Sequence, residues 1–117
     1  MYINPGQQEQ WLKNLKIKDL NPMQASVLES TDQNKNIILL SQTGSGKTLA
    51  FLLPMLASID TNLRRSQALI MAPSRELVLQ IESVLKQMQT GISTTACYGG
   101  HKREIEENNL KESPAII

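Results

Sequence analysis

An α/β domain, in which a parallel sheet is flanked by helices, is the fold class that this 117-residue sequence predicts. Short apolar segments of strand length alternate along the chain with longer segments whose apolar residues recur at helical spacing. Apolar residues make up 40% of the chain, enough for a core, and aromatic residues only 3%, so this core is mainly aliphatic. At this length we expect one small domain.

Four segments have the composition of strands in a parallel sheet. They are short, and the first three end at polar residues, at a proline or at paired glycines. The predicted strands are residues 36–40, 67–72, 94–98 and 115–117. The first two are almost continuously apolar, so we expect them to be buried on both faces of the sheet.

Helices are predicted at residues 22–29, 47–59, 75–89 and 101–110. Asn21 is a favourable N-cap with Pro22 at the first helical position, and Ser74 is the expected N-cap of the third helix. Pro54 is expected to kink the second helix or to end it early. The third helix has a clear apolar stripe, formed by Leu77, Val78, Ile81, Val84, Leu85 and Met88. The fourth is polar, so we expect it to be exposed.

A glycine-rich segment follows the first predicted strand and opens the second predicted helix. It consists of Ser41, Gln42, Thr43, Gly44, Ser45, Gly46, Lys47 and Thr48. Glycines let successive N–H groups converge on phosphate oxygens, and the helix adds its positive N-terminal end. Lys47 can reach the β and γ phosphates, and the Thr48 hydroxyl can bind Mg²⁺. A tight turn that merely uses glycine is the alternative, but the pattern predicts a nucleotide site.

Together with three other blocks, this segment makes the chain resemble the DEAD-box RNA helicases along nearly its whole length. The blocks, in the family's order, are Gln24 with the segment before it, Ser41–Thr48, Pro73–Leu77 and Gly99–Gly100. The resemblance implies an incomplete RecA-like P-loop NTPase domain. Residues 1–31 would be the adenine-recognition segment, or Q motif, and residues 32–117 the first RecA-like ATP-binding domain, truncated before the acidic motif.

Gln24 matches the glutamine after which the family's Q motif is named. A side-chain amide can donate and accept at once, so it can pair with N6 and N7 of adenine and select ATP. An ordinary polar residue on the first turn of a helix is the alternative. The family also stacks an upstream aromatic residue on adenine, and Tyr2 is the best candidate by sequence order. Trp11 lies in a helical run of apolar residues and is expected in the core.

The resemblance implies that two further blocks contact the RNA backbone and do not recognise its bases. The residues are Pro73, Ser74, Arg75, Glu76, Gly99 and Gly100. Physically, the first four join the end of a strand to a capped helix, which presents N–H groups and a guanidinium to a phosphate. A capped helix start with a solvent-facing Arg75–Glu76 pair, and a simple glycine turn, are the alternatives. His101 stands alone and predicts no metal site.

The resemblance therefore implies an ATP-dependent RNA helicase that uses ATP and Mg²⁺ and binds RNA. A DNA-dependent helicase or translocase of the same superfamily, and a non-catalytic ATP-binding module, remain the alternatives. The net charge of +1 does not separate them, and protein partners cannot be inferred. Cys97 is the only cysteine, and no signal peptide or membrane-length apolar run is visible, so we expect a cytoplasmic protein.

The acidic motif and the second domain of the family do not occur within these 117 residues. In the family they complete Mg²⁺ binding, position the attacking water and supply arginine fingers, one of which alone contributes about 10³–10⁵ in rate. We therefore expect these 117 residues by themselves to bind ATP without appreciable hydrolysis. RNA-stimulated ATP turnover by this chain alone would contradict that expectation.

Overall fold

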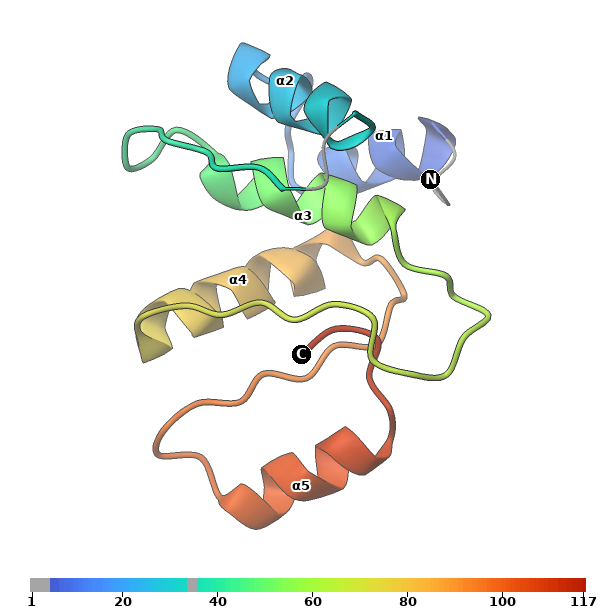
Figure 1. Ribbon diagram of the computed structural model, residues 1–117, viewed down its shortest axis with the longest axis vertical. Helices are drawn as coiled ribbons and strands as arrows, with labels where there is room; N and C mark the ends of the chain where they lie inside the picture. The colour runs from blue at the N-terminus through green and yellow to red at the C-terminus, as the bar shows by residue number, and fades with distance from the viewer. Residues whose placement is uncertain (1–4, 34–35) are drawn as a thin grey trace. The chain divides into compact units, whose positions relative to one another are not determined.

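The computed structural model describes residues 5–33 and 36–117. They contain five α-helices: α1 (Pro5–Asn14), α2 (Pro22–Thr31), α3 (Lys47–Ala57), α4 (Arg75–Met88) and α5 (Arg103–Lys111) (Figure 1). The chain forms two compact units, Met1–Ser58 with α1 to α3 and Ile59–Ile117 with α4 and α5. None of the helices in the described part of the chain is both long enough and apolar enough to cross a membrane.

The core of the first unit is built around α3, which packs against α2. Its sequence is almost entirely apolar, so nearly every turn contributes a buried side chain. The buried residues of α3 are Leu49, Ala50, Leu52, Leu53, Pro54, Leu56 and Ala57. The helix continues for three residues beyond Pro54 and ends two residues before the predicted position. Trp11 is 5% exposed, which confirms its predicted place in the core.

Both predicted helix caps are confirmed. Asn21 Oδ1 accepts from the Gln24 N–H at 2.9 Å, and Gln24 Oε1 accepts from the Asn21 N–H at 3.0 Å, a reciprocal capping box at the start of α2. At α4, Ser74 Oγ accepts from the Leu77 N–H at 3.2 Å. Each cap satisfies backbone donors that have no acceptor within their own helix.

The second unit places three extended segments beside one another in parallel. Residue Ile116 forms parallel bridges with Ala68 on one side and with Thr94 on the other. The Ile117 N–H donates to the Ala68 carbonyl at 3.1 Å, and the Ile116 N–H donates to the Ser93 carbonyl at 3.1 Å. The segment 115–117 therefore lies between the segments around residues 68 and 94.

The predicted strands nevertheless do not form regular strands in the described part of the chain. The middle segment supplies only residues 115–117, so each pairing is limited to a single bridge. The stripe predicted on α4 is confirmed, because Ile81, Leu85 and Met88 are buried. Ile116 is fully buried as well. The helix and the apolar segments thus form the expected core, while the ladder of backbone hydrogen bonds is short.

The expectation that residues 36–40 are buried on both faces is wrong. Ile37 and Leu39 help to line a cavity of about 380 Å³ together with residues of α2 and α3. Ile38 and Leu40, which alternate with them, are each 89% exposed. In extended backbone, successive side chains point to opposite sides, so one side of this segment faces the cavity and the other faces solvent, and Ile37 on the cavity side is itself 39% exposed. It takes part in neither of the parallel bridges.

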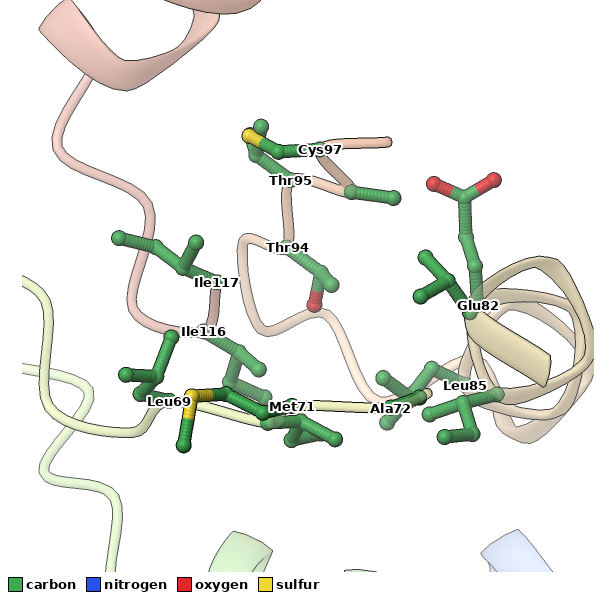
Figure 2. Close-up of a pocket in the computed structure, with 14 residues that line it drawn as sticks. Leu69, Met71, Ala72, Glu82, Leu85, Thr94, Thr95, Cys97, Ile116 and Ile117 are labelled. Carbon is green, nitrogen blue, oxygen red and sulfur yellow. The ribbon is translucent and has the colours of Figure 1, made fainter. Parts of the chain in front are cut away.

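A second cavity, of about 390 Å³, lies in the second unit between α4 and the extended segments. Figure 2 shows Leu85 and Glu82 projecting from α4 on one side, with Ile116 and Ile117 across from them. Leu69 and Met71 border the same cavity and are 66% and 85% exposed, so the expectation that residues 67–72 are buried on both faces is wrong as well. None of the residues with a predicted function lines this cavity.

Candidate functional site

The glycine-rich segment forms a loop that enters the N-terminus of α3. Gly44 and Gly46 have φ angles of +80° and +90°, in the left-handed region that favours glycine. Gly46 is the residue that precedes the helix, and α3 begins at Lys47. The N–H groups of a first helical turn have no intrahelical acceptor, so they can donate to an anion at this end.

Hydrogen bonds within the loop connect its side chains to one another and to its backbone. Lys47 Nζ donates to the Ser41 carbonyl, and the Ser41 and Ser45 hydroxyls are hydrogen-bonded at 2.6 Å. The Ser45 N–H donates to the Gln42 carbonyl at 3.2 Å, which closes a turn. Lys47 therefore lies folded over the loop, with its ammonium group among the atoms that the motif brings together.

The cap of α2 also braces this loop, which the sequence did not predict. Asn21 Nδ2 donates to the Ser45 carbonyl at 2.9 Å, and Gln24 Nε2 donates to the Gly46 carbonyl at 3.1 Å. A Cβ atom on Gly46 would collide with the Gln24 amide and would lie 3.3 Å from Asn21 Nδ2. The conformation of Gly46 and the cap of α2 therefore depend on each other.

Gln24 is 5% exposed, and its amide is already engaged at both ends. An amide oxygen has two lone pairs and an amide nitrogen has two protons, so one acceptor position and one donor position are left. That remaining capacity matches the pairing expected with adenine. The structure thus gives Gln24 a bracing role that the sequence did not predict, and adenine recognition stays a prediction.

Tyr2, the predicted stacking residue, lies outside the described residues. Thr48 is half-buried in the first turn of α3, directly after Lys47. Groups of three or more histidine, cysteine or acidic side chains that could hold a metal do not occur in the described ranges. Mg²⁺ at a nucleotide keeps several waters and also binds the phosphates, so it needs few protein ligands, and the Thr48 hydroxyl has the chemistry to be one of them.

The other predicted blocks come together in the second unit. Pro73, Ser74, Arg75 and Glu76 are all exposed, as are Gly99 and Gly100. Arg75 Nη1 lies 3.5 Å from the Gly99 carbonyl oxygen, and Arg75 Cζ lies 5.5 Å from the centre of the Tyr98 ring. Gly100 has a φ of +87°, and a Cβ there would lie 2.9 Å from Arg75 Nη1. The guanidinium thus lies against the glycine turn, 24 residues away in sequence.

Three residues next to this turn were missed from the sequence. The Tyr98 and His101 rings are stacked, with centroids 5.0 Å apart and planes 13° apart. Glu106 Oε2 accepts from the Tyr98 N–H at 2.9 Å and lies 3.3 Å from His101 Nδ1. Helix α5 begins at Arg103, two residues later than predicted, since His101 belongs to this turn. The stretch interpreted as a solvated helix face therefore supplies a structural carboxylate.

Cys97, beside the same carboxylate, is exposed, yet its pKa is raised. Desolvation is the main cause, followed by the negative charge of Glu106 and a hydrogen bond between the two side chains. All three favour the neutral thiol over the thiolate. The only cysteine of the chain is therefore less reactive than an ordinary exposed thiol.

Known proteins resemble the chain over almost its whole length. The family model for the DEAD/DEAH box helicase matches residues 21–117. The ATP-dependent RNA helicase DeaD of Escherichia coli K12 is 34% identical over 91% of this chain, and the DEAD-box ATP-dependent RNA helicase CshC of Bacillus cereus is 35% identical over 98% of it. The chain spans 17% and 30% of the lengths of these two relatives.

A solved structure has the same fold. The hypothetical ATP-dependent RNA helicase of Sulfolobus tokodaii superposes with a TM-score of 0.79 at 25% identity. The match covers 97% of this chain and 33% of that protein. The family model alone covers most of the chain, and it includes the glycine-rich loop, Arg75 and the Gly99–Gly100 turn. The chain therefore belongs to the DEAD/DEAH box helicase family.

Proposed function

We propose that this chain binds ATP at Ser41–Thr48 and the RNA backbone at Arg75 and Gly99–Gly100, as part of an ATP-dependent RNA helicase. The observation that carries the proposal is the loop itself, in which two glycines with positive φ lead into α3 beside Lys47. The names of the relatives support the helicase activity, ATP hydrolysis and RNA as the partner.

The phosphate loop is proposed to bind ATP through its positive charge and through the orientation of its N–H groups. N–H groups of the loop and of the first turn of α3 point at the phosphates, and the helix end adds partial positive charge. Lys47 leaves the Ser41 carbonyl and bonds the β and γ phosphates. Gln42, Thr43 and Ser45 supply the remaining backbone of the loop. The catalytic contribution of Lys47 is to stabilise charge on the transferred phosphate.

Mg²⁺ is the proposed cofactor, and Thr48 is its proposed protein ligand. When bound, the ion neutralises phosphate charge and orients the phosphates for transfer. The hydroxyl of Thr48 stands one residue beyond Lys47, on the first turn of α3, so it lies at the end where the phosphates are proposed to bind. Tyr2 as the aromatic residue on adenine, and a cytoplasmic location, both stay predictions.

The RNA proposal concerns phosphates and not bases. Arg75 is exposed at the start of α4, where its guanidinium and the N–H groups of the capped helix can contact one anion together. Pro73, Ser74 and Glu76 shape this start, and Gly100 permits the approach of Arg75. The two parallel bridges at Ile116 support the further proposal of a parallel sheet flanked by helices.

Gln24→Ala separates adenine recognition from bracing of the loop. Adenine pairing would lose two hydrogen bonds, so we expect ATP affinity to fall about 10- to 30-fold. Pyrophosphate senses only the loop, and its affinity should fall less. Calorimetric titration with both ligands measures the difference. Ser26→Ala, an exposed polar position on the same helix, is the matched control. Equal losses for ATP and pyrophosphate would reject adenine recognition by Gln24.

Arg75→Ala tests the RNA contact. Removing one phosphate contact should lower the affinity for single-stranded RNA and reduce the slope of log affinity against log salt by about 0.7. Fluorescence anisotropy of a labelled oligouridylate at several salt concentrations gives both quantities. Arg64→Ala removes the same charge from an exposed position in the same unit. If both variants lose the same affinity and slope, Arg75 makes no specific phosphate contact.

A further inference from the structure

Glu106 stands out because one carboxylate oxygen serves several groups of the turn beside Arg75. Its Oε2 accepts from the Tyr98 N–H at 2.9 Å and lies 3.3 Å from His101 Nδ1. The side chain of Glu106 is 17% exposed. The neighbouring acidic residues on α5, Glu104 and Glu107, are exposed. A carboxylate here is stabilised by the positive N-terminal end of α5.

These contacts connect Glu106 to the proposed RNA site through Tyr98. The Tyr98 ring is stacked on His101 and lies 5.5 Å from Arg75 Cζ, and Gly99 and Gly100 follow directly in the chain. A hydrogen bond on the Tyr98 N–H fixes the backbone at the start of the turn, and the bond to His101 fixes its end. The guanidinium of Arg75 then lies against a turn that is held on both sides.

A negative charge is otherwise out of place near a site for phosphates. Repulsion between a carboxylate and RNA would weaken binding, so attraction of RNA gives no reason for Glu106 at this position. The charged or titratable side chains that face it are His101 and Cys97, with Arg75 beyond the Tyr98 ring. Its hydrogen bonds to the turn, and not an attraction between its charge and RNA, therefore explain its place.

We propose that Glu106 is a positioning residue, which holds the Gly99–Gly100 turn and Arg75 in the arrangement that receives an RNA phosphate. This inference rests on the proposed RNA binding at that turn. It assigns Glu106 no contact with RNA, since the carboxylate acts through Tyr98 and His101. The neighbouring acidic residue Glu104 is exposed and takes part in none of the hydrogen bonds of Arg75, Tyr98, His101 and Glu106 that are described above, so it provides a matched comparison.

Three variants separate positioning from charge. Glu106→Ala removes the charge and the hydrogen bonds, Glu106→Gln removes the charge but keeps an acceptor for the Tyr98 N–H, and Glu104→Ala removes a charge two residues away. We expect oligouridylate affinity to fall about five- to tenfold in Glu106→Ala. It should stay within about twofold in Glu106→Gln, and stay equal or rise in Glu104→Ala.

Two further readouts show whether the effect is confined to the unit that contains the turn and whether Glu106 lies beside Cys97. Affinity for ATP should be unchanged in all three, because the phosphate loop belongs to the other unit. Alkylation of Cys97 by iodoacetamide should be faster in both Glu106 variants and unchanged in Glu104→Ala, since the Glu106 charge no longer raises the pKa of the thiol.

The outcomes distinguish this inference from the proposed function. If the unaltered protein does not bind oligouridylate, RNA binding at this turn is wrong and the role of Glu106 falls with it. If the unaltered protein binds and Glu106→Ala binds equally well or better, RNA binding stands and positioning by Glu106 is overturned. Equal losses in the alanine and glutamine variants would likewise overturn it, because the charge would then be what matters.

Discussion

Replacing Lys47 with alanine is expected to lower ATP affinity about 100-fold or more. Lys47 Nζ is the only charged side-chain group among residues 41–48, and hydrogen bonds between charged groups contribute about 1.5–3 kcal/mol each. Two phosphate contacts therefore account for at least about 3 kcal/mol. Titration calorimetry with ATP measures the loss directly.

The same substitution should leave the stability of the fold nearly unchanged. A cation at the N-terminus of a helix is unfavourable, by about 0.3–1 kcal/mol, because the helix dipole is positive there. The bond from Lys47 to the Ser41 carbonyl offsets this cost. A residue that lowers the stability of its own helix, as the cation of Lys47 does at the N-terminus of α3, is expected where function requires it. Urea unfolding of Lys47→Ala should therefore give a free energy within about 1 kcal/mol of the unaltered protein.

Lys86→Ala is the control for this prediction. Lys86 lies on α4, is 74% exposed and pairs with Glu82 at 3.0 Å, an exposed pair on one helix face. Its removal should affect neither ATP affinity nor stability by more than about 0.5 kcal/mol. If Lys47→Ala also kept its ATP affinity, the loop would not be a phosphate site.

Gly46→Ala is expected to be the most destabilising single change in the loop. A side chain at φ +90° costs about 1–2 kcal/mol, and the new Cβ would also collide with the Gln24 amide. Relief of that collision requires movement of the α2 cap, which adds about 1–3 kcal/mol. We expect the free energy of unfolding to fall by about 2–5 kcal/mol and ATP binding to be lost.

Gly44→Ala measures the cost of the left-handed backbone conformation without the collision with the Gln24 amide. Gly44 has a φ of +80°, but a Cβ there meets nothing within 4 Å. Its substitution should therefore cost only the conformational part, about 1–2 kcal/mol. Urea unfolding of both variants measures the difference between them. Equal losses would mean that the contact between Gly46 and the cap of α2 contributes nothing to stability.

Local features were predictable from sequence, because few neighbouring residues decide them. Asn21 and Ser74 cap their helices as expected, since each cap involves only the next turn. The phosphate loop likewise depends on glycines within a few residues of one another. The apolar spacing in α4 predicted its buried side, and the composition of α3 predicted its burial.

Features that depend on distant segments were predicted less well. Burial of residues 36–40 depends on what covers each side, and even on the side of the cavity Ile37 is 39% exposed and Leu39 only half-buried. The bond from Gln24 to the Gly46 carbonyl spans 22 residues, and no local pattern indicates it. In the sequence, Glu106 is one charge among several on a polar predicted helix. Its role becomes visible only when the turn brings Tyr98 and His101 to its side.

Amide NMR of the protein titrated with ATP and Mg²⁺ shows whether residues 41–48 bind the phosphates of ATP. We expect saturable shifts centred on the amides of the loop and the first turn of α3, and their loss in Lys47→Ala. Saturable shifts centred elsewhere, or shifts that persist unchanged in Lys47→Ala, would contradict phosphate binding there.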